Sequence, residues 1–176
     1  LFELCEMDLI NMTPCQGYNY IFVIQEHMSK WGQLVPLKNR SAQEVVRALR
    51  LVLPGLLAIP AVVYSDGALE FKSNLLKDLF NEYDIRHVVG APHMSSTRGS
   101  VERLNQVFEK LIRVSLHDND WVSGLDRVAV TYNNTHNRII GTTPSQFISE
   151  RIHNIYRPSI ATTVEKQFWW VGNPIF

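Results

Sequence analysis

The chain has 176 residues, of which 45% are hydrophobic and 19% are charged. This length and composition exclude a disordered chain and two full domains, and they predict one α/β core over residues 1–150 with a short C-terminal linker or truncated module over 151–176. Seventeen basic and seventeen acidic residues give zero net charge, so we expect any affinity for nucleic acid to come from a local patch or from flanking domains.

Three β-strands are predicted near the N-terminus from their apolar pattern and the turn residues between them. They cover Leu4–Ile10, Tyr18–Gln25 and Trp31–Leu37. Their short separations predict an antiparallel meander. A capping box at Ser41–Glu44 then begins an amphipathic helix, which Pro54 and Gly55 end.

Strands and helices alternate in the remainder of the predicted core. A short strand over Ala61–Tyr64 leads to Asp66, and Ser73 can cap the helix that follows. The later elements are a strand over Ile85–Val89, a loop over Ala91–Gly99, a helix from Ser100 and a last core helix over Trp121–Asn137.

Three acidic residues occupy the settings that a metal site needs. Asp8 lies within the first strand, Asp66 follows a buried strand, and Glu102 falls in the first turn of a helix, with 35 residues between the last two. Taken singly, Asp66 is equally explained as a turn residue and Glu102 as a helix N-terminal acid. Together, the three carboxylates suit Mg²⁺ or Mn²⁺, and two such ions about 3.5–4 Å apart can transfer a phosphoryl group. The pattern therefore predicts a phosphoryl-transfer enzyme.

The segments around these acids resemble retroelement integrases. Ser65–Phe71 is similar to the integrase segment in which Ser-Asp precedes a glycine turn and Glu-Phe. Gly99–Asn105 is similar to the Gly-x-Val-Glu-Arg-Phe/Leu-Asn segment of integrases of the Ty3/gypsy kind. Met28–Trp31 and Gly141–Phe147 resemble two further family segments. Over about residues 4–150 the chain is identified as a member of the retroviral and retrotransposon integrase catalytic cores, in the DDE superfamily.

The resemblance implies a ribonuclease-H-like fold, which is an α/β domain with a five-stranded mixed sheet flanked by helices, its first and fourth strands adjacent. It implies that Asp8, Asp66 and Glu102 are the catalytic residues and hold two Mg²⁺ or Mn²⁺ ions. The implied partners are DNA, as element ends and target, with no small-molecule cofactor. Related cores also self-associate, and the apolar faces Val45–Leu53 and Trp121–Tyr132 are the expected contacts of a homo-oligomer.

The helix of Glu102 also carries the expected DNA contacts, and here the chain departs from its family. The candidate DNA-binding residues are Arg98, Arg103, Asn105 and Gln106. Many relatives have basic residues four and seven positions after the glutamate, where this chain has Gln106 and Glu109. A glutamate beside DNA repels phosphates, whereas a lysine would release counterions.

Two other functions stay open. A non-catalytic or host-domesticated integrase remnant, acting as a DNA- or protein-interaction module, agrees with the zero net charge and with Gln106 and Glu109. A ribonuclease acting on RNA/DNA hybrids shares the fold and the metals. The Gly-Ser-Val-Glu-Arg helix start and the 35-residue gap favour an integrase over this ribonuclease.

The sequence also predicts where the protein acts. Cys5 and Cys15 are the only cysteines, which suits a reducing intracellular compartment. The longest uncharged apolar stretch, Leu51–Tyr64, is too short to cross a bilayer, and acidic residues interrupt the apolar N-terminus. We therefore expect an intracellular protein with no membrane partner, nuclear when it acts on chromosomal DNA.

Overall fold

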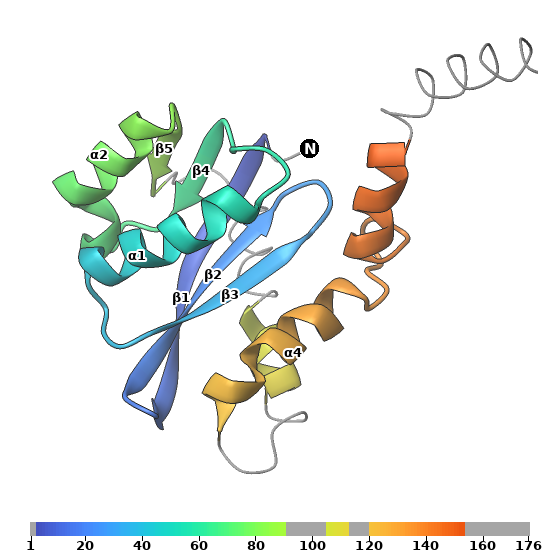
Figure 1. The fold of residues 1–176 in the computed structure, drawn as a ribbon, viewed down its shortest axis with the longest axis horizontal. Coiled ribbons are helices and arrows are strands. Elements are labelled where there is room, and N and C mark those ends of the chain that lie inside the picture. The colour runs from blue at the N-terminus through green and yellow to red at the C-terminus, as the bar shows by residue number, and fades with distance from the viewer. Residues whose placement is uncertain (1–2, 91–104, 113–119, 154–176) are drawn as a thin grey trace, which may run out of the picture.

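A computed structural model describes residues 3–90, 105–112 and 120–153 (Figure 1). The elements in chain order are β1 (Leu4–Cys15), β2 (Tyr18–Glu26), β3 (Gly32–Leu37), α1 (Ala42–Val52), η1 (Leu53–Gly55), β4 (Val62–Ser65), η2 (Leu69–Lys72), α2 (Asn74–Glu82), β5 (Arg86–Val89) and α4 (Trp121–Asn133). Residues 105–112 and 144–153 are helical as well.

The strands form one sheet in the order β3-β2-β1-β4-β5. The pairs β1–β2 and β2–β3 are antiparallel, whereas β1–β4 and β4–β5 are parallel. This arrangement confirms the predicted five-stranded mixed sheet and the predicted contact between the first and fourth strands.

The first strand runs to Cys15, five residues beyond the end that its apolar pattern predicts. Its outer part forms a hairpin with β2, and Cys15 pairs with Tyr18. Gln16 and Gly17 both have positive φ angles, of 50° and 81°, as the two central residues of a type I′ turn do. Pairing with β2 therefore extends a strand that Pro14 was expected to end.

Side-chain alternation gives each face of the sheet its own core. In β2, Phe22 and Ile24 pack with α1 and α2, whereas Ile21 and Val23 pack with α4 and the helix 105–112. In Figure 1, α1 and α2 lie together and apart from α4. Ile10 of β1 belongs to the second core, so alternation places Asp8 on the face of β1 that the helix 105–112 approaches.

The predicted starts of three helices are confirmed, the predicted start at Ser100 lies outside the described residues, and one predicted helix end is wrong. Ser41 and Ser73 cap α1 and α2 through their hydroxyl groups, as the sequence indicates. The last core helix ends at Asn133 rather than Asn137. The chain turns there because Asn137 pairs with Thr142 in an isolated β-bridge, with Gly141 at a φ of 69°.

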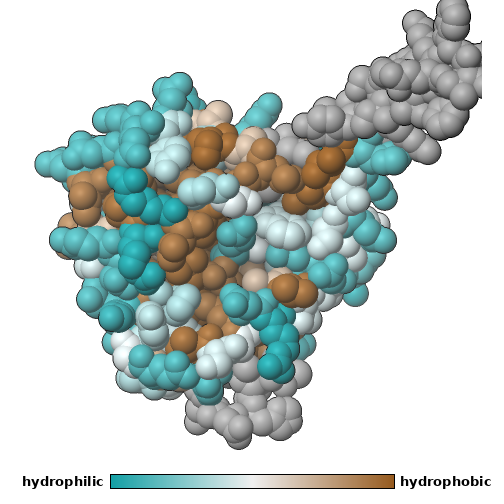
Figure 2. All heavy atoms as spheres, in the orientation of Figure 1, coloured by the Kyte–Doolittle hydropathy of each residue, from teal (hydrophilic) through white to brown (hydrophobic). Residues whose placement is uncertain are grey.

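The apolar stripes expected to make a homo-oligomer are used inside the chain. They are buried in the two cores through Val45, Val46, Ala48, Leu49, Val52, Leu53, Trp121, Leu125, Val128 and Tyr132. The inward sides of both segments are therefore covered by the chain itself. Leu51 and Val130 of the same two segments are 62% and 61% exposed, so contact with a second copy stays a prediction. Figure 2 shows hydrophobic residues gathered over the middle of the face on which α1 lies.

The last described helix, residues 144–153, runs across residue 150, where the sequence placed the end of the core. Ile148 is buried and Ile152 packs against the core that contains α1. The predicted tail from residue 154 onward lies outside the described residues. In the part of the chain that the structure describes, no helix is both long and apolar enough to cross a membrane.

Candidate metal centre

Parallel pairing of β1 with β4 brings the first two predicted metal ligands together. Leu4 pairs with Val62 and Glu6 with Tyr64, and this register, continued by two residues, sets Asp8 beside Asp66. Asp66 directly follows β4 and is exposed, and its Oδ1 accepts a hydrogen bond of 3.0 Å from the backbone N–H of Ala68. That bond forms the turn for which Asp is suited. Two carboxylates thus lie at the end of β4.

The electrostatics of Asp8 are those of a partly buried carboxylate beside a like charge. Burial raises the pKa of Asp8, and the negative charge of Asp66 raises it further. The backbone N–H of Leu9, the amide of Asn105 and the charge of Arg40 act in the opposite direction. Ionised Asp8 therefore lies where a bound cation would offset both burial and repulsion.

Asn105 joins the helix 105–112 to this site. Its Nδ2 donates to Oδ2 of Asp8 at 2.7 Å, while Oδ1 of Asp8 accepts from the backbone N–H of Leu9 at 2.8 Å. The Oδ1 of Asn105 is buried and has no hydrogen-bond partner among the described residues. Carboxylate and amide oxygens are hard ligands, of the kind that Mg²⁺ and Mn²⁺ take. The donor set therefore fits a divalent cation.

The other predicted site residues are only partly placed. Glu102, Arg98 and Arg103 lie outside the described residues. Gln106 is exposed and Glu109 is partly buried. Within residues 3–90, 105–112 and 120–153, no group of three or more His, Cys, Asp or Glu side chains could hold a metal, so the described part supplies two carboxylates of the predicted three.

Arg40 is a member of this site that the sequence did not indicate. Its guanidinium forms a hydrogen-bonded ion pair with Glu70, and its positive charge acts on both Asp8 and Asp66. Arg40 precedes the capping residue of α1, and Glu70 lies 30 residues later in η2. A contact across that distance leaves no local pattern in the sequence.

His87 supports the turn that carries Asp66 from the neighbouring strand. Its ring nitrogen Nε2 lies 2.9 Å from Oγ of Ser65, and that hydroxyl donates to the carbonyl oxygen of Asp66 at 3.0 Å. Because the hydroxyl has one proton and gives it to Asp66, Nε2 of His87 must be the donor to Ser65. Burial lowers the pKa of His87 to about 4, so the ring is neutral at pH 7.

We expect His87 to make the chain less stable in mild acid. Its folded pKa is below its ordinary value of 6.5, so the unfolded chain binds the proton first and stability falls as the pH drops from 6.5 toward 4. The full shift would correspond to about 3 kcal/mol, and partial exposure reduces this to about 1–2 kcal/mol. Urea unfolding of the parent and of His87→Gln, at pH 7 and at about pH 4.5, measures it.

The glutamine keeps an N–H group for Ser65 but does not titrate. Glu6 and Asp8, whose pKa values are raised mainly by burial, affect both proteins alike, so the difference between the two isolates His87. Equal losses of stability in acid for parent and variant would contradict the assignment.

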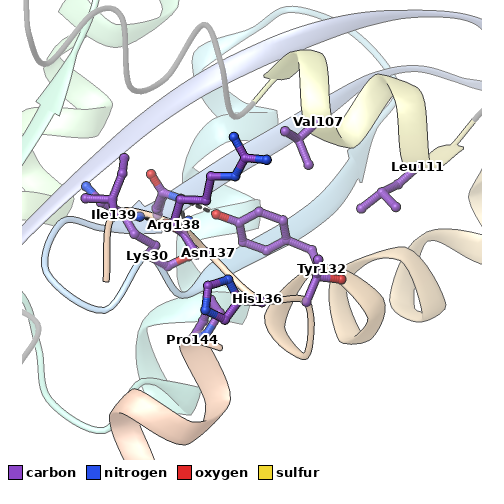
Figure 3. Close-up of a pocket in the computed structure, with 11 residues that line it drawn as sticks. Lys30, Val107, Leu111, Tyr132, His136, Asn137, Arg138, Ile139 and Pro144 are labelled. Carbon is purple, nitrogen blue, oxygen red and sulfur yellow. Dashed lines mark hydrogen bonds between the residues drawn. The ribbon is translucent and has the colours of Figure 1, made fainter. Parts of the chain in front are cut away.

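A pocket of about 520 Å³, separate from the carboxylates of Asp8 and Asp66, lies between the helix 105–112 and the end of α4. Figure 3 shows Val107 and Leu111 on one side of it and Tyr132 and His136 on the other. Among the described residues, its lining also contains Lys30 and Arg138 but no carboxylate. This pocket therefore lacks the ligands of a magnesium site.

Comparison with known proteins places the chain among retroelement proteins. No family model matches it. It is 31% identical over 151 residues to the Tf2-3 and Tf2-4 transposon polyproteins of Schizosaccharomyces pombe (strain 972 / ATCC 24843). The match covers 84% of this chain but only 11% of each polyprotein.

Solved structures show the same fold at lower identity. The catalytic core domain of BIV integrase matches with a TM-score of 0.71 and 19% identity, over 88% of this chain and 99% of that one. The HTLV-2 integrase catalytic core, in complex with magnesium and in a trimeric form, matches with 0.69 and 18%, over 82% and 95%. A chain of the simian T-cell lymphotropic virus intasome, in complex with the PP2A regulatory subunit B56 gamma, matches with 0.70 and 17%, over 82% and 53%. The fold is therefore ribonuclease-H-like, as in these integrase catalytic cores, and the sequence is similar to a segment of the transposon polyproteins.

Proposed function

We propose that this chain is the catalytic core of a retroelement integrase, a nucleotidyltransferase and endonuclease that cuts DNA and joins element ends to target DNA. The observation that carries the proposal is the position of Asp8 beside Asp66, which follows from the parallel register of β1 with β4, with the amide of Asn105 on Asp8. The magnesium complex of the HTLV-2 core supports a divalent metal.

Asp8, Asp66 and Glu102 would hold two Mg²⁺ or Mn²⁺ ions, which supply charge stabilisation at the phosphodiester and an activated attacking oxygen. The sheet fixes Asp8 and Asp66 relative to each other, since both belong to paired strands or their ends. Asn105 orients the carboxylate of Asp8. Glu102 precedes Asn105 by three residues, a spacing that puts two side chains on one helix face, so we expect it to complete the set.

The test is metal-dependent strand transfer or disintegration on oligonucleotide substrates. Asp66→Asn keeps the shape of the side chain but removes the charge, and it should abolish the activity of the parent. Asp78→Asn is the matched control, because Asp78 is an exposed residue of α2. Activity that survives Asp66→Asn at the level of Asp78→Asn would refute the catalytic assignment.

The second candidate is a non-catalytic or host-domesticated remnant that binds DNA or protein. The exposed Gln106 and the acidic Glu109, one helical turn apart, favour it, because neither neutralises a phosphate. Calorimetric titration with Mn²⁺ separates the two candidates. Binding that Asp66→Asn removes supports the metal-dependent enzyme, and absence of binding supports the remnant.

We propose self-association and a nuclear place of action as part of the same function. The trimeric form of the HTLV-2 core and the simian T-cell lymphotropic virus intasome are assemblies of proteins with this fold. Exposed Leu51 and Val130 are apolar surface positions at which a second copy could pack. Sedimentation at about 10–100 μM, where weak interfaces still form, tests the oligomer.

A further inference from the structure

The side chain of Arg40 is held by an ion pair and is nevertheless exposed to solvent. Its Nε donates to Oε1 of Glu70, and the exposed fractions are 49% for the arginine side chain and 6% for the glutamate side chain. Within the described residues, the terminal nitrogens Nη1 and Nη2 of Arg40 have no hydrogen bond to protein. The buried carboxylate thus anchors the guanidinium at one nitrogen and leaves its outer edge open to solvent.

The open edge of Arg40 lies beside the metal centre. Arg40 lowers the pKa of Asp8 by its charge, and the charge of Asp66 raises the pKa of Arg40. A pocket of about 640 Å³ adjoins it, lined by Arg40, Ser41, Ala42, Ala68, Leu69 and Glu70. Ala68 is two residues from Asp66 and donates its N–H to that carboxylate. The turn that contains Asp66 and Ala68 therefore borders both the pocket and the metal centre.

The open pair of guanidinium nitrogens matches the geometry of a phosphate group. Arginine binds phosphate through two parallel N–H bonds, and its charge is permanent. In the described helix 105–112, whose Asn105 bonds to Asp8, the positions four and seven residues after Glu102 are Gln106 and Glu109, neither of which is a cation. We propose that Arg40, anchored by Glu70, binds a backbone phosphate of the DNA strand next to the reacting phosphodiester.

This inference rests on the proposed function, and the salt dependence of DNA binding tests it separately. Each phosphate contact on duplex DNA contributes about 0.9 to the slope of log affinity against log salt. Arg40→Gln should therefore lower that slope by about 0.9, measured by fluorescence anisotropy of a labelled duplex between about 50 and 200 mM NaCl. Binding at the low-salt end should weaken as well.

Arg50→Gln is the matched control. Arg50 also forms an ion pair with a glutamate, Glu82, and its side chain is 52% exposed. It belongs to α1, and its charge is not among the causes that shift the pKa of Asp8. The control should keep the slope of the parent, because it removes an equal charge away from the metal centre.

A purely structural role for Arg40 predicts a different pattern. Removal of Arg40 leaves Glu70 buried and unpaired, which can unfold the region by itself. The double variant Arg40→Gln with Glu70→Gln removes both charges, and it should recover the thermal stability of the parent while keeping the reduced slope. Recovery of the parental slope in the double variant would overturn the inference.

The outcomes separate this inference from the proposed function. If the parent binds DNA and Arg40→Gln behaves like Arg50→Gln, the phosphate contact is wrong and the integrase assignment stands. If the parent shows no salt-dependent binding of DNA, the phosphate contact is wrong as well. Failure of the integrase assignment shows instead in strand transfer that Asp66→Asn does not change, whatever the slope for Arg40→Gln.

Discussion

Replacement of Asp8 by asparagine should abolish metal-dependent strand transfer and, at the same time, raise the melting temperature of the metal-free chain. The loss of activity should be about 1000-fold or more, because a metal ligand supplies several kcal/mol of transition-state stabilisation. The gain in stability follows from the setting of Asp8. Burial and the charge of Asp66 raise its pKa, so the ionised form is costly at pH 7 and a neutral side chain of the same shape removes that cost.

The hydrogen bonds of Asp8 can be kept in the variant. An amide at position 8 can still accept from the backbone N–H of Leu9. It can also donate to Oδ1 of Asn105, which is buried without a partner among the described residues, once the amide of Asn105 turns over. The bond between positions 8 and 105 is then kept with its direction reversed, while the cost of the buried charge is removed.

Thermal melting in EDTA measures the gain in stability, and melting with Mn²⁺ measures the loss of the metal site. The strand-transfer assay measures the loss of activity. A gain of about 1 kcal/mol corresponds to about 2–4 °C for a chain of this size. Mn²⁺ should raise the melting temperature of the parent but not that of Asp8→Asn, because ligand binding stabilises only a fold that has the site. Asp126→Asn, at an exposed position of α4, is the control. A metal-free Asp8→Asn that melts below the parent would contradict this account of the site.

The order of elements was predictable because local signals mark it. The serines at positions 41 and 73 cap α1 and α2, and apolar runs between turn residues mark the strands. Element ends were less predictable where pairing decides them. The extension of β1 to Cys15 needs β2 beside it, and the end of α4 at Asn133 depends on the pairing of Asn137 with Thr142.

The candidate metal centre likewise contains residues that the sequence predicts and residues that only tertiary contacts reveal. Asp8 and Asp66 could be predicted, since each stands in a strand-linked motif, and the parallel register confirms that they lie together. Arg40 could not, because its place depends on Glu70, a buried partner 30 residues away. Asn105 was expected to contact DNA, and that role stays a prediction. Its bond to Asp8 spans 97 residues and emerges only when the helix packs on the sheet.

Asn133 makes the contact that positions α4 against β3. Its Oδ1 accepts from the backbone N–H of Gly32 at 2.9 Å, and its Nδ2 donates to the carbonyl oxygen of Gly32 at 2.8 Å, all buried. Gly32 is the first residue of the edge strand β3. A Cβ atom there would lie 3.0 Å from Cζ of Phe108 and 3.1 Å from Cε1 of Tyr132. At this point α4, β3 and the helix 105–112 meet.

Asn133→Ala should therefore destabilise the chain by about 2–4 kcal/mol, because it leaves the N–H and the carbonyl of Gly32 buried without partners. The melting temperature should fall by about 5–10 °C. Asn134→Ala is the control, since the neighbouring asparagine is exposed and its Nδ2 donates only to the carbonyl oxygen of Val130.

Function gives a second measurement of the same contact. Phe108 packs against Tyr132 with their ring centroids 4.5 Å apart, and it lies three residues after Asn105, the residue that holds Asp8. Loosening α4 from β3 should therefore weaken Mn²⁺ binding at a temperature where Asn133→Ala is still folded. Melting and Mn²⁺ affinity equal to those of Asn134→Ala would show that the packing of α4 on β3 does not depend on this pair of hydrogen bonds. In that case the position of Asn105 on Asp8 must come from the apolar contacts of the helix 105–112, which include those of Phe108 and Ile112.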